Sequence, residues 1–458
     1  MKKTLILHDL SPSDAASFLP ATSDEYLLFS ATPTVRYCVG CFGCWIKMPG
    51  KCVIADRGAE LVRPLSLCDE FIVISRMTFG GMSPDVKAVL DRSIGFLMPF
   101  FRYINGETHH TKRYDKTPGL RYLFYGDDMT AREKATAEKL AIANQLNLGF
   151  GNPSVEFYRT ARECAEALDA QGAQTSSSDA DAQERESAGA ATDVSAATNV
   201  DANISAATDI GVTADVSAAT DVSAATDIGA ATDVGESGNA RATENVSAPG
   251  STHAKVALVN GSPKPGSSAS KLILEALRQR LGPSSDCAVC NPAKQERGEI
   301  IHAIGGSDAI VFIFPLYVDG IPSQLLRLLD EARAEIADAA PGAKVYAVVN
   351  NGFYESRQNI PALEMMRHFT ERAGLSWGGG IGVGAGAMTH ATTIGRGPLK
   401  KLGRALDSLA RDITNRATAD DYTFEPSFPR FLYKAIAHSG WRRAARKNGL
   451  TAKQLYRR

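Results

Sequence analysis

The 458-residue sequence lacks a continuous apolar run long enough to cross a membrane. Its longest stretch beyond the N-terminus, residues 309–318, is about half the length of a membrane-spanning helix and contains Pro315. At the N-terminus, His8 and Asp9 end the apolar residues too early for the hydrophobic region of a signal peptide. We therefore expect a cytoplasmic protein that makes no contact with a membrane.

The sequence also lacks an excess of charge of one sign, since its formal net charge is −1. A balanced charge produces no field that would attract nucleic acid, so we expect no nucleic-acid partner. Cysteine is scarce and unevenly placed. Four of the eight cysteines fall at Cys38, Cys41, Cys44 and Cys52. In a cytoplasmic chain such a cluster is not expected to be a disulfide framework.

Residues 169–253 lack aromatic side chains and repeat the sequence Ser-Ala-Ala-Thr-Asp-Val, for example at 217–222. A short period of this kind can also build a parallel β-helix. However, single valines and isoleucines provide few large side chains for a core. Because too little apolar area is available to offset chain entropy, we predict that 169–253 is a disordered, acidic linker.

The linker separates two segments, 1–168 and 254–415, in which apolar strands alternate with helical patterns. In the second segment the apolar runs lie at 255–259, 309–314 and 345–349. This alternation predicts a parallel sheet covered by helices on both faces, which binds ligands at the carboxyl ends of its strands. The last segment, 416–458, is aromatic and basic, and we predict an amphipathic helix docked on the preceding domain.

A loop rich in glycine and serine, at 260–270, lies between the first strand and the first helix of the second segment. Its glycines let backbone N–H groups point inward, and the helix N-terminus adds partial positive charge, so the loop can hold a phosphate. The side chains available to a phosphate are Ser262, Lys264, Ser267, Ser268 and Ser270. A serine that caps the helix without any ligand is the alternative interpretation. No Gly-Lys-Ser/Thr ends the loop, so triphosphate chemistry is not expected.

Two later loops follow apolar strands and each contain an aromatic residue and a glycine, at 315–323 and 350–355. With these loops in succession, the segment 254–415 resembles the NAD(P)H-dependent FMN reductases and the related flavodoxin-like quinone reductases. The resemblance implies that the serines and Lys264 hold the phosphate of FMN, with Lys264 in place of a more usual arginine. It also implies that the flavin ring is lined by Pro315, Leu316, Tyr317 and Gly320, and on the other side by Asn351, Gly352 and Phe353.

The same resemblance implies an oxidoreductase that takes electrons from NAD(P)H and passes them to a quinone, a flavin or another small acceptor. No catalytic side chain is expected, because hydride passes directly from the nicotinamide to the flavin ring. Enzymes of this family usually dimerise. We therefore expect either a pseudo-dimer of the two segments within one chain or a homodimer.

The N-terminal segment resembles the family at 75–83 but not in its first loop, which begins at His8. In that loop Asp9 and Asp14 would repel a phosphate, and no glycine opens the turn. We predict a flavodoxin-like domain that has lost FMN binding. The expected fold is thus two flavodoxin-like, doubly wound parallel sheets joined by the disordered linker.

The cysteine cluster has the spacing Cys38-x2-Cys41-x2-Cys44-x7-Cys52. Three thiols two residues apart, with a fourth on the returning loop, can hold a [4Fe–4S] cluster. The spacing is similar to that of the iron–sulfur flavoproteins of the same superfamily, which implies an alternative function as an electron carrier. Structural or redox-active thiols are a second interpretation, and zinc is a less natural third. A further alternative function is a non-catalytic flavodoxin-like binding protein.

Overall fold

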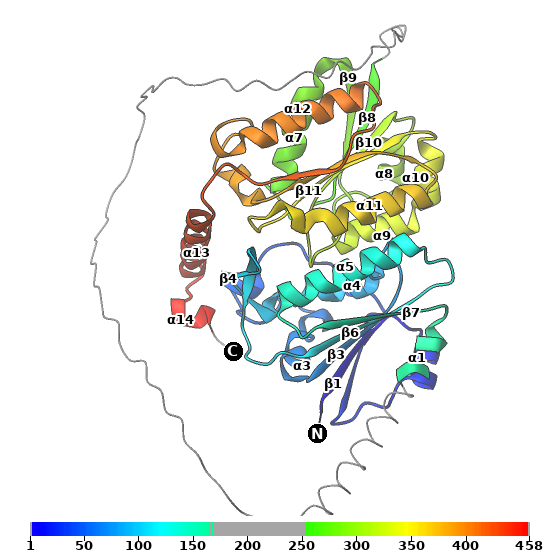
Figure 1. Ribbon diagram of the computed structural model, residues 1–458, viewed down its shortest axis with the longest axis vertical. Coiled ribbons are helices and arrows are strands. Elements are labelled where there is room, and N and C mark those ends of the chain that lie inside the picture. The colour runs from blue at the N-terminus through cyan, green and yellow to red at the C-terminus, as the bar shows by residue number, and fades with distance from the viewer. Residues whose placement is uncertain (1, 165, 169–252, 457–458) are drawn as a thin grey trace, which may run out of the picture. The chain divides into compact units, whose positions relative to one another are not determined.

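The computed structural model describes residues 2–164, 166–168 and 253–456 (Figure 1). The predicted linker therefore lies outside the described residues, except for His253. Among the described residues, no helix is both long and apolar enough to cross a membrane. The described residues before and after the linker, the N-terminal half and the C-terminal half, belong to one compact unit.

The N-terminal half contains a sheet of five parallel strands in the order β2-β1-β3-β6-β7. These strands are β1 (Thr4–His8), β2 (Tyr26–Ser30), β3 (Glu70–Arg76), β6 (Gly119–Tyr125) and β7 (Pro153–Tyr158). The helices are α1 (Pro12–Phe18), α2 (Gly43–Ile46), α3 (Val62–Leu67), α4 (Pro84–Asp91) and α5 (Ala131–Leu148). Apolar clusters lie on both faces of the sheet, so β1 and β3 are buried and their sequences are continuously apolar.

An antiparallel hairpin, β4 (Leu97–Ile104) and β5 (Glu107–Lys112), is inserted between α4 and β6. The side chains of Met98 and Phe100 on β4 pack against the C-terminal residues Ala445 and Leu455. The apolar run that follows α4 is thus covered by the other end of the chain.

The C-terminal half contains a sheet of six parallel strands in the order β13-β12-β11-β10-β8-β9. These strands are β8 (Ala254–Asn260), β9 (Ser285–Cys290), β10 (Ala309–Pro315), β11 (Lys344–Asn350), β12 (Ser376–Val383) and β13 (Tyr422–Phe424). The helices are α7 (Ala269–Leu281), α8 (Arg297–Ile304), α9 (Ser323–Glu331), α10 (Arg333–Ala339), α11 (Ile360–Arg372) and α12 (Lys400–Thr414). After β13 come α13 (Arg430–Lys447) and α14 (Ala452–Leu455). Short 3₁₀ helices lie at Arg57–Ala59, Ser93–Phe96, Gly282–Ser284, Ser356–Asn359, Gly386–His390 and Gly397–Leu399.

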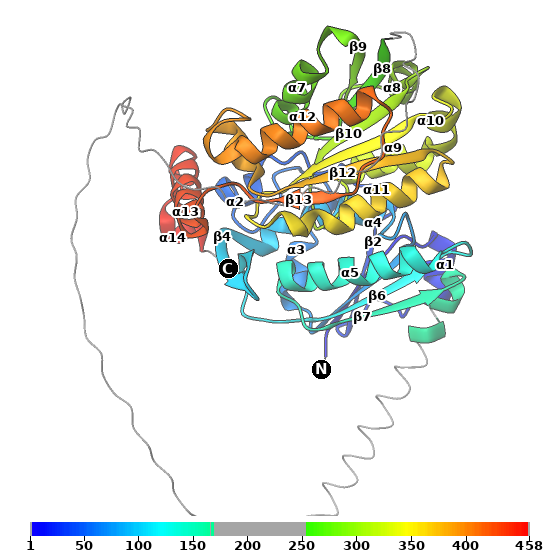
Figure 2. The ribbon, with the colours of Figure 1, turned by 45° about the horizontal axis from the view of Figure 1, so that its top comes forward.

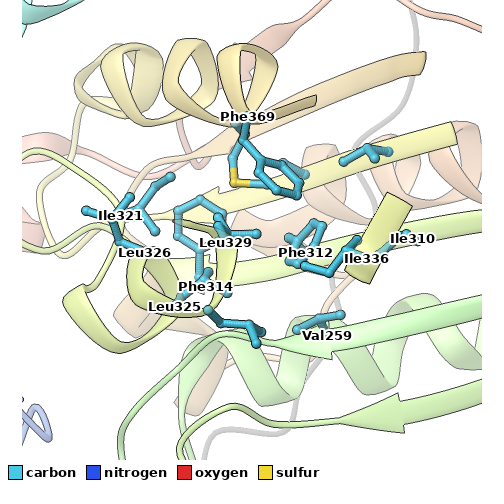
Figure 3. Packing of buried hydrophobic residues seen from close by; sticks show 14 of the residues in the cluster. Val259, Ile310, Phe312, Phe314, Ile321, Leu325, Leu326, Leu329, Ile336 and Phe369 are labelled. Atoms are coloured by element: carbon cyan, nitrogen blue, oxygen red, sulfur yellow. The ribbon is translucent and has the colours of Figure 1, made fainter. Parts of the chain in front are cut away.

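Side chains of β10 alternate between two apolar clusters, as expected for a central strand. On one face, Phe312 and Phe314 pack against Leu325 and Leu329 of α9 and against Phe369 of α11 (Figure 3). On the other face, side chains of the same strand pack against α7 and α12. Because the sheet is covered on both faces, the ends of its strands are the places where loops can form a binding site.

In both halves the parallel strands, numbered along the chain, begin with the order 2-1-3-4-5 that characterises flavodoxin-like sheets. The prediction of two doubly wound parallel sheets is confirmed. The two halves pack through corresponding helices, α4 against α9 and α5 against α11 (Figures 1 and 2). Each half therefore presents the helix after its third strand, and the helix after its fourth, to the other half.

Candidate functional site

The loop at 260–270 connects β8 to α7, and its polar side chains are partly used to shape it. Ser268 caps α7 by accepting a hydrogen bond from the backbone N–H of Lys271 at 3.2 Å. The buried serines of the loop are Ser262, Ser268 and Ser270. Ser267, in contrast, is exposed. The alternative to a phosphate site was a serine that only caps the helix. Ser268 does cap α7, and its side chain also lines the cavity described below.

The loop runs as close to the neighbouring strand and helix as a glycine permits. A Cβ on Gly261 would lie 2.6 Å from Leu325 Cδ2 and 2.8 Å from Phe314 Cβ. At the far end of the loop, Asn350 Nδ2 donates hydrogen bonds to Ser270 Oγ at 2.8 Å and to the carbonyl of Phe314 at 3.0 Å. Asn350 thus links the ends of β10 and β11 to the loop at 260–270, which we call the serine loop. The sequence interpretation missed it, although a polar residue at the end of an apolar strand was the available signal.

The ring loop, residues 315–322, folds back on itself at the end of β10. Tyr317 and Gly320 exchange two backbone hydrogen bonds of 3.1 and 3.0 Å. Between them Val318 and Asp319 have φ angles of 38° and 59°, in the left-handed region that non-glycine residues rarely adopt. The N–H groups of these two residues donate to no backbone carbonyl of the described residues. Two successive N–H groups in this geometry can bind an anionic or electron-rich atom of a ligand.

A cavity of about 480 Å³ lies where the serine loop, the ring loop and the loop after β11 meet. All the residues predicted to contact a cofactor line it except Ser267, which is exposed, and Gly320, which closes the ring loop. Asn351 lines the cavity, and its buried Oδ1 has no hydrogen-bond partner among the described residues. The structure therefore brings together most of the side chains that the sequence predicted.

The cavity continues into a group of aromatic side chains that the sequence interpretation did not place at the site. The aromatic cage consists of Phe42, Trp45, Phe101, His110, Tyr433 and Trp441. Trp45 stacks on Phe42 with ring centroids 5.2 Å apart, and it meets Trp441 edge-on at the same separation. Burial lowers the pKa of His110 to about 3, so its imidazole is neutral at physiological pH. The cage is thus an uncharged, largely apolar enclosure.

The cysteine cluster borders the same cavity through Cys38. Cys44 and Cys52 are buried, whereas Cys41 is exposed. Burial raises the pKa of Cys38 to about 12, and the neighbouring Asp91, Cys52 and Cys41 add to the effect. Burial also raises the pKa of Cys44, with further contributions from the other three thiols of the cluster.

Four thiolates around one centre are the donor set that a [4Fe–4S] cluster uses. Within the described ranges, however, no three His, Cys, Asp or Glu side chains are arranged to hold a metal ion. The [4Fe–4S] cluster stays a prediction.

The first loop of the N-terminal half differs from the serine loop in chemistry. Asp9 accepts hydrogen bonds from the backbone N–H of Arg76 at 3.0 Å and from the Tyr125 hydroxyl at 3.0 Å. Burial raises the pKa of Asp9. A partly buried carboxyl group therefore takes up donors at the strand ends where a phosphate would otherwise bind.

Comparisons with known proteins give only distant similarity in fold. No protein-family model matches the sequence, and no curated protein is similar to it. Among solved structures, a flavodoxin of Streptococcus pneumonia TIGR4 is 12% identical, covers 36% of this chain and 99% of its own, and has a TM-score of 0.27. An azoreductase from Bacillus anthracis is 15% identical, with coverages of 36% and 99% and a TM-score of 0.26. An FMN-dependent NADH-azoreductase of the same species, solved in complex with FMN, is 12% identical, with coverages of 35% and 100% and a TM-score of 0.25.

Proposed function

We propose that the chain is an FMN-dependent oxidoreductase that takes electrons from NADH or NADPH and passes them to a small acceptor such as a quinone or a free flavin. One observation carries the proposal. A single cavity is lined by buried serines at a helix N-terminus, by the ring loop with its left-handed residues Val318 and Asp319, and by an aromatic enclosure. These three environments suit, in turn, the phosphate, the polar ring edge and the flat ring of FMN.

The phosphate end of FMN would lie against Ser262, Ser268 and Ser270, with Lys264 supplying positive charge. A helix N-terminus and free N–H groups favour an anion at this place. Ser267 is exposed and does not line the cavity, so we do not include it among the residues that would hold the phosphate.

The ring of FMN would lie between the ring loop and Phe353. FMN supplies hydride acceptance at this place, and the chain stabilises the negative charge of the reduced ring. The N–H groups of Val318 and Asp319 are suitable donors, because fixed dipoles in a cavity shielded from water act strongly on a developing charge. The aromatic cage beyond the ring excludes water and fits a flat, uncharged acceptor such as a quinone.

We assign FMN to the C-terminal half, 254–415, and no FMN to the N-terminal half, 1–168. The N-terminal half instead covers the cavity within the same chain, as a pseudo-dimer would. We also propose a cytoplasmic location.

The assignment is tested with two lysines near the start of α7. Lys264 lines the cavity, whereas Lys271 is exposed on the helix. We expect Lys264→Ala to raise the Kd for FMN about tenfold and to leave the Kd for riboflavin, which has no phosphate, unchanged. Lys271→Ala should change neither Kd by more than about twofold. Titration of the flavin-free protein with FMN or with riboflavin, followed by flavin fluorescence, measures the two Kd values. Equal losses for FMN and riboflavin, or no binding by the unmodified protein, would refute the assignment.

The reductase activity is tested by the oxidation of NADH and of NADPH with menadione as acceptor. Iron and sulfide assays on anaerobically purified protein separate this proposal from the second candidate, an iron–sulfur electron carrier. That candidate is favoured by one observation, the position of Cys38 on the wall of the proposed flavin cavity. About four irons per chain with slow nicotinamide turnover would support the electron carrier. A protein that stays colourless after addition of FMN would support a non-catalytic role.

A further inference from the structure

The ring loop needs support from outside itself. Val318 and Asp319 adopt left-handed backbone conformations, which are costly for residues other than glycine and persist only where the surroundings impose them. Inside the loop only the two backbone hydrogen bonds between Tyr317 and Gly320 act against this cost. The remaining polar contacts of the loop come largely from the N-terminal half.

Asp319 extends from the ring loop into the N-terminal half and is 3% exposed. Asn144 Nδ2 donates to its Oδ2 at 2.7 Å, and Asn147 Nδ2 donates to its Oδ1 at 2.5 Å. Both asparagines are on α5 and are buried. The carboxylate is therefore held at both oxygens by side chains of the other half. Val318 adds an apolar contact, since its side chain packs against the core of the N-terminal half.

Lys87 and Asp91, one turn apart on α4, hold the two ends of the ring loop. Lys87 Nζ donates to the carbonyl of Tyr317 at 2.6 Å and forms an ion pair with Asp91. Asp91 Oδ2 in turn accepts from the backbone N–H of Ser323 at 2.9 Å. Both charged side chains are only 1% exposed. Burying an ion pair this deeply is costly unless further polar groups complete its hydrogen bonds, and here the ring loop supplies them.

The corresponding loop of the N-terminal half, residues 78–81, receives no matching polar contacts from the described residues of the C-terminal half. That loop has the same backbone geometry, because Thr78 and Gly81 exchange two hydrogen bonds of 2.9 Å and Phe79 has a φ of 52°. Phe79, however, packs into the apolar core of the C-terminal half. Gly80 stands where the ring loop has Asp319, and the position that corresponds to Lys87 is Leu326.

We propose that Lys87, Asn144 and Asn147 of the N-terminal half are positioning residues for the flavin ring bound by the C-terminal half. They keep the N–H groups of Val318 and Asp319 directed at the ring edge. The inference rests on the proposed function. The N-terminal half, whose own first loop contains an aspartate, thereby has the role of fixing the ring loop of the C-terminal half.

A pair of variants tests this role. It is chosen so that the buried hydroxyl of Tyr122 is not left without its hydrogen-bond acceptor when Asn144 is replaced. Asn144 is buried outside the cavity lining, and its Oδ1 accepts from the Tyr122 hydroxyl at 2.6 Å. Tyr122→Phe removes that hydrogen bond alone and serves as the control. The double variant Tyr122→Phe/Asn144→Leu also removes the contact with Asp319. Thr136→Val is a second control, because it removes a buried contact between the halves, to His368 at 2.9 Å, away from the ring loop.

The measurements are the Kd of the stripped full-length chain for FMN, its thermal unfolding and the midpoint potential of bound FMN. We expect the double variant to bind FMN about tenfold or more weakly than Tyr122→Phe, since a hydrogen bond to a charged group is lost. Its midpoint potential should become more negative, because the reduced ring loses more stabilisation than the oxidised ring. The Kd and potential of Tyr122→Phe and Thr136→Val should stay close to those of the unmodified chain.

The outcomes separate this inference from the proposed function. If the unmodified chain binds no FMN, the proposed function fails and the positioning role fails with it. If the unmodified chain binds FMN and the double variant keeps its Kd and potential, only the positioning role is overturned. A fall in affinity shared equally by Thr136→Val would also overturn it. Should the double variant not fold, Asp319→Asn decides in its place, since it retains the side-chain shape but faces two amide donors with one acceptor oxygen.

Discussion

The backbone of Gly40 passes so close to Tyr317 that a Cβ on Gly40 would lie 2.0 Å from the Tyr317 Oη. Gly40 has a φ of 61°, which only glycine adopts at low cost. The side chain of Tyr317 is partly buried, and burial raises the pKa of its phenol well above the ordinary value. The cysteine loop of one half therefore rests on the ring loop of the other through a contact that has no room for a side chain.

Gly40→Ala should lower the free energy of unfolding more than an alanine substitution at a glycine with similar backbone and free space. Gly374 is such a glycine, with a φ of 66° and no atom within 4 Å of its Cβ position. We expect a loss of about 1 kcal/mol for Gly374→Ala, from the backbone alone, and a loss at least about 1 kcal/mol larger for Gly40→Ala. Urea unfolding of both variants measures the difference. Equal losses would show that the contact with Tyr317 is relaxed in solution.

Trp441→Ala should impair the acceptor more than the flavin. Trp441 forms a wall of the aromatic cage on α13 and meets Phe42 edge-on at 5.1 Å. Its removal opens the cage, so we expect kcat/KM for menadione to fall about tenfold while the Kd for FMN changes by less than about twofold. Trp377→Phe, near the N-terminal end of β12 (Ser376–Val383) and outside the cavity lining, is the control. A parallel loss of FMN affinity in Trp441→Ala would place the flavin ring itself inside the cage.

The buried His110 should make stability depend on pH in a defined direction. Its folded-state pKa is about 3, against an ordinary value of 6.5, and burial is the main cause, with smaller effects of His109 and His438. Between these values the unfolded chain binds a proton that the folded chain excludes, so stability is complete above pH 6.5 and falls as the pH decreases. This single group should remove about 2 kcal/mol between pH 6.5 and pH 5.

His110→Gln should flatten that part of the profile, measured by urea unfolding at pH 7.5 and pH 5.0. Some slope will persist in the variant, because burial also lowers the pKa of His8, to about 4. An unchanged slope in His110→Gln would mean that the imidazole is solvated.

The cysteines of the cluster should differ in reactivity toward iodoacetamide. Cys41 is exposed, whereas Cys44 is buried, Cys38 is partly buried, and both of these thiols have raised pKa values. Since the thiolate is the reactive form, we expect Cys41 to be alkylated first at pH 8 and Cys38 and Cys44 to be protected until the chain unfolds. Mass spectrometry of peptides from a time course measures this order. Protection of Cys41 together with the other three would instead indicate a bound cluster, and equal labelling of Cys38 and Cys41 would contradict the burial.

The fold and the centre of the site could be predicted because their signals are local in the sequence. Continuous apolar runs indicated the strands. The loops that follow these strands contain either several serines or an aromatic residue near a glycine, and these loops indicated the site. Asn350 was placed in the loop 350–355 but not among the site residues, because nothing local in the sequence shows that its side chain bonds to the serine loop.

The walls of the site could not be predicted, because they come from distant parts of the chain. Phe42, Phe101 and Tyr433 have no local pattern that relates them, and they meet only through packing of the two halves and the C-terminal helix. Lys87 gave no signal either. In the sequence it occupies an ordinary helical position, and its contact with the Tyr317 carbonyl of the other half is visible only in the structure.

The contact between α13 and β4 has a consequence for the order in which the protein is completed. The backbone N–H of Phe101 donates to His438 Nε2 at 2.7 Å, across a sequence separation of 337 residues. During synthesis both sheets can form before α13 leaves the ribosome, because domains generally fold as units from the N-terminus onward. The side of the cavity formed by α13 closes only after the residues of α13 have emerged from the ribosome. A chain truncated after residue 429 should therefore form both sheets and leave the cavity open to cofactor.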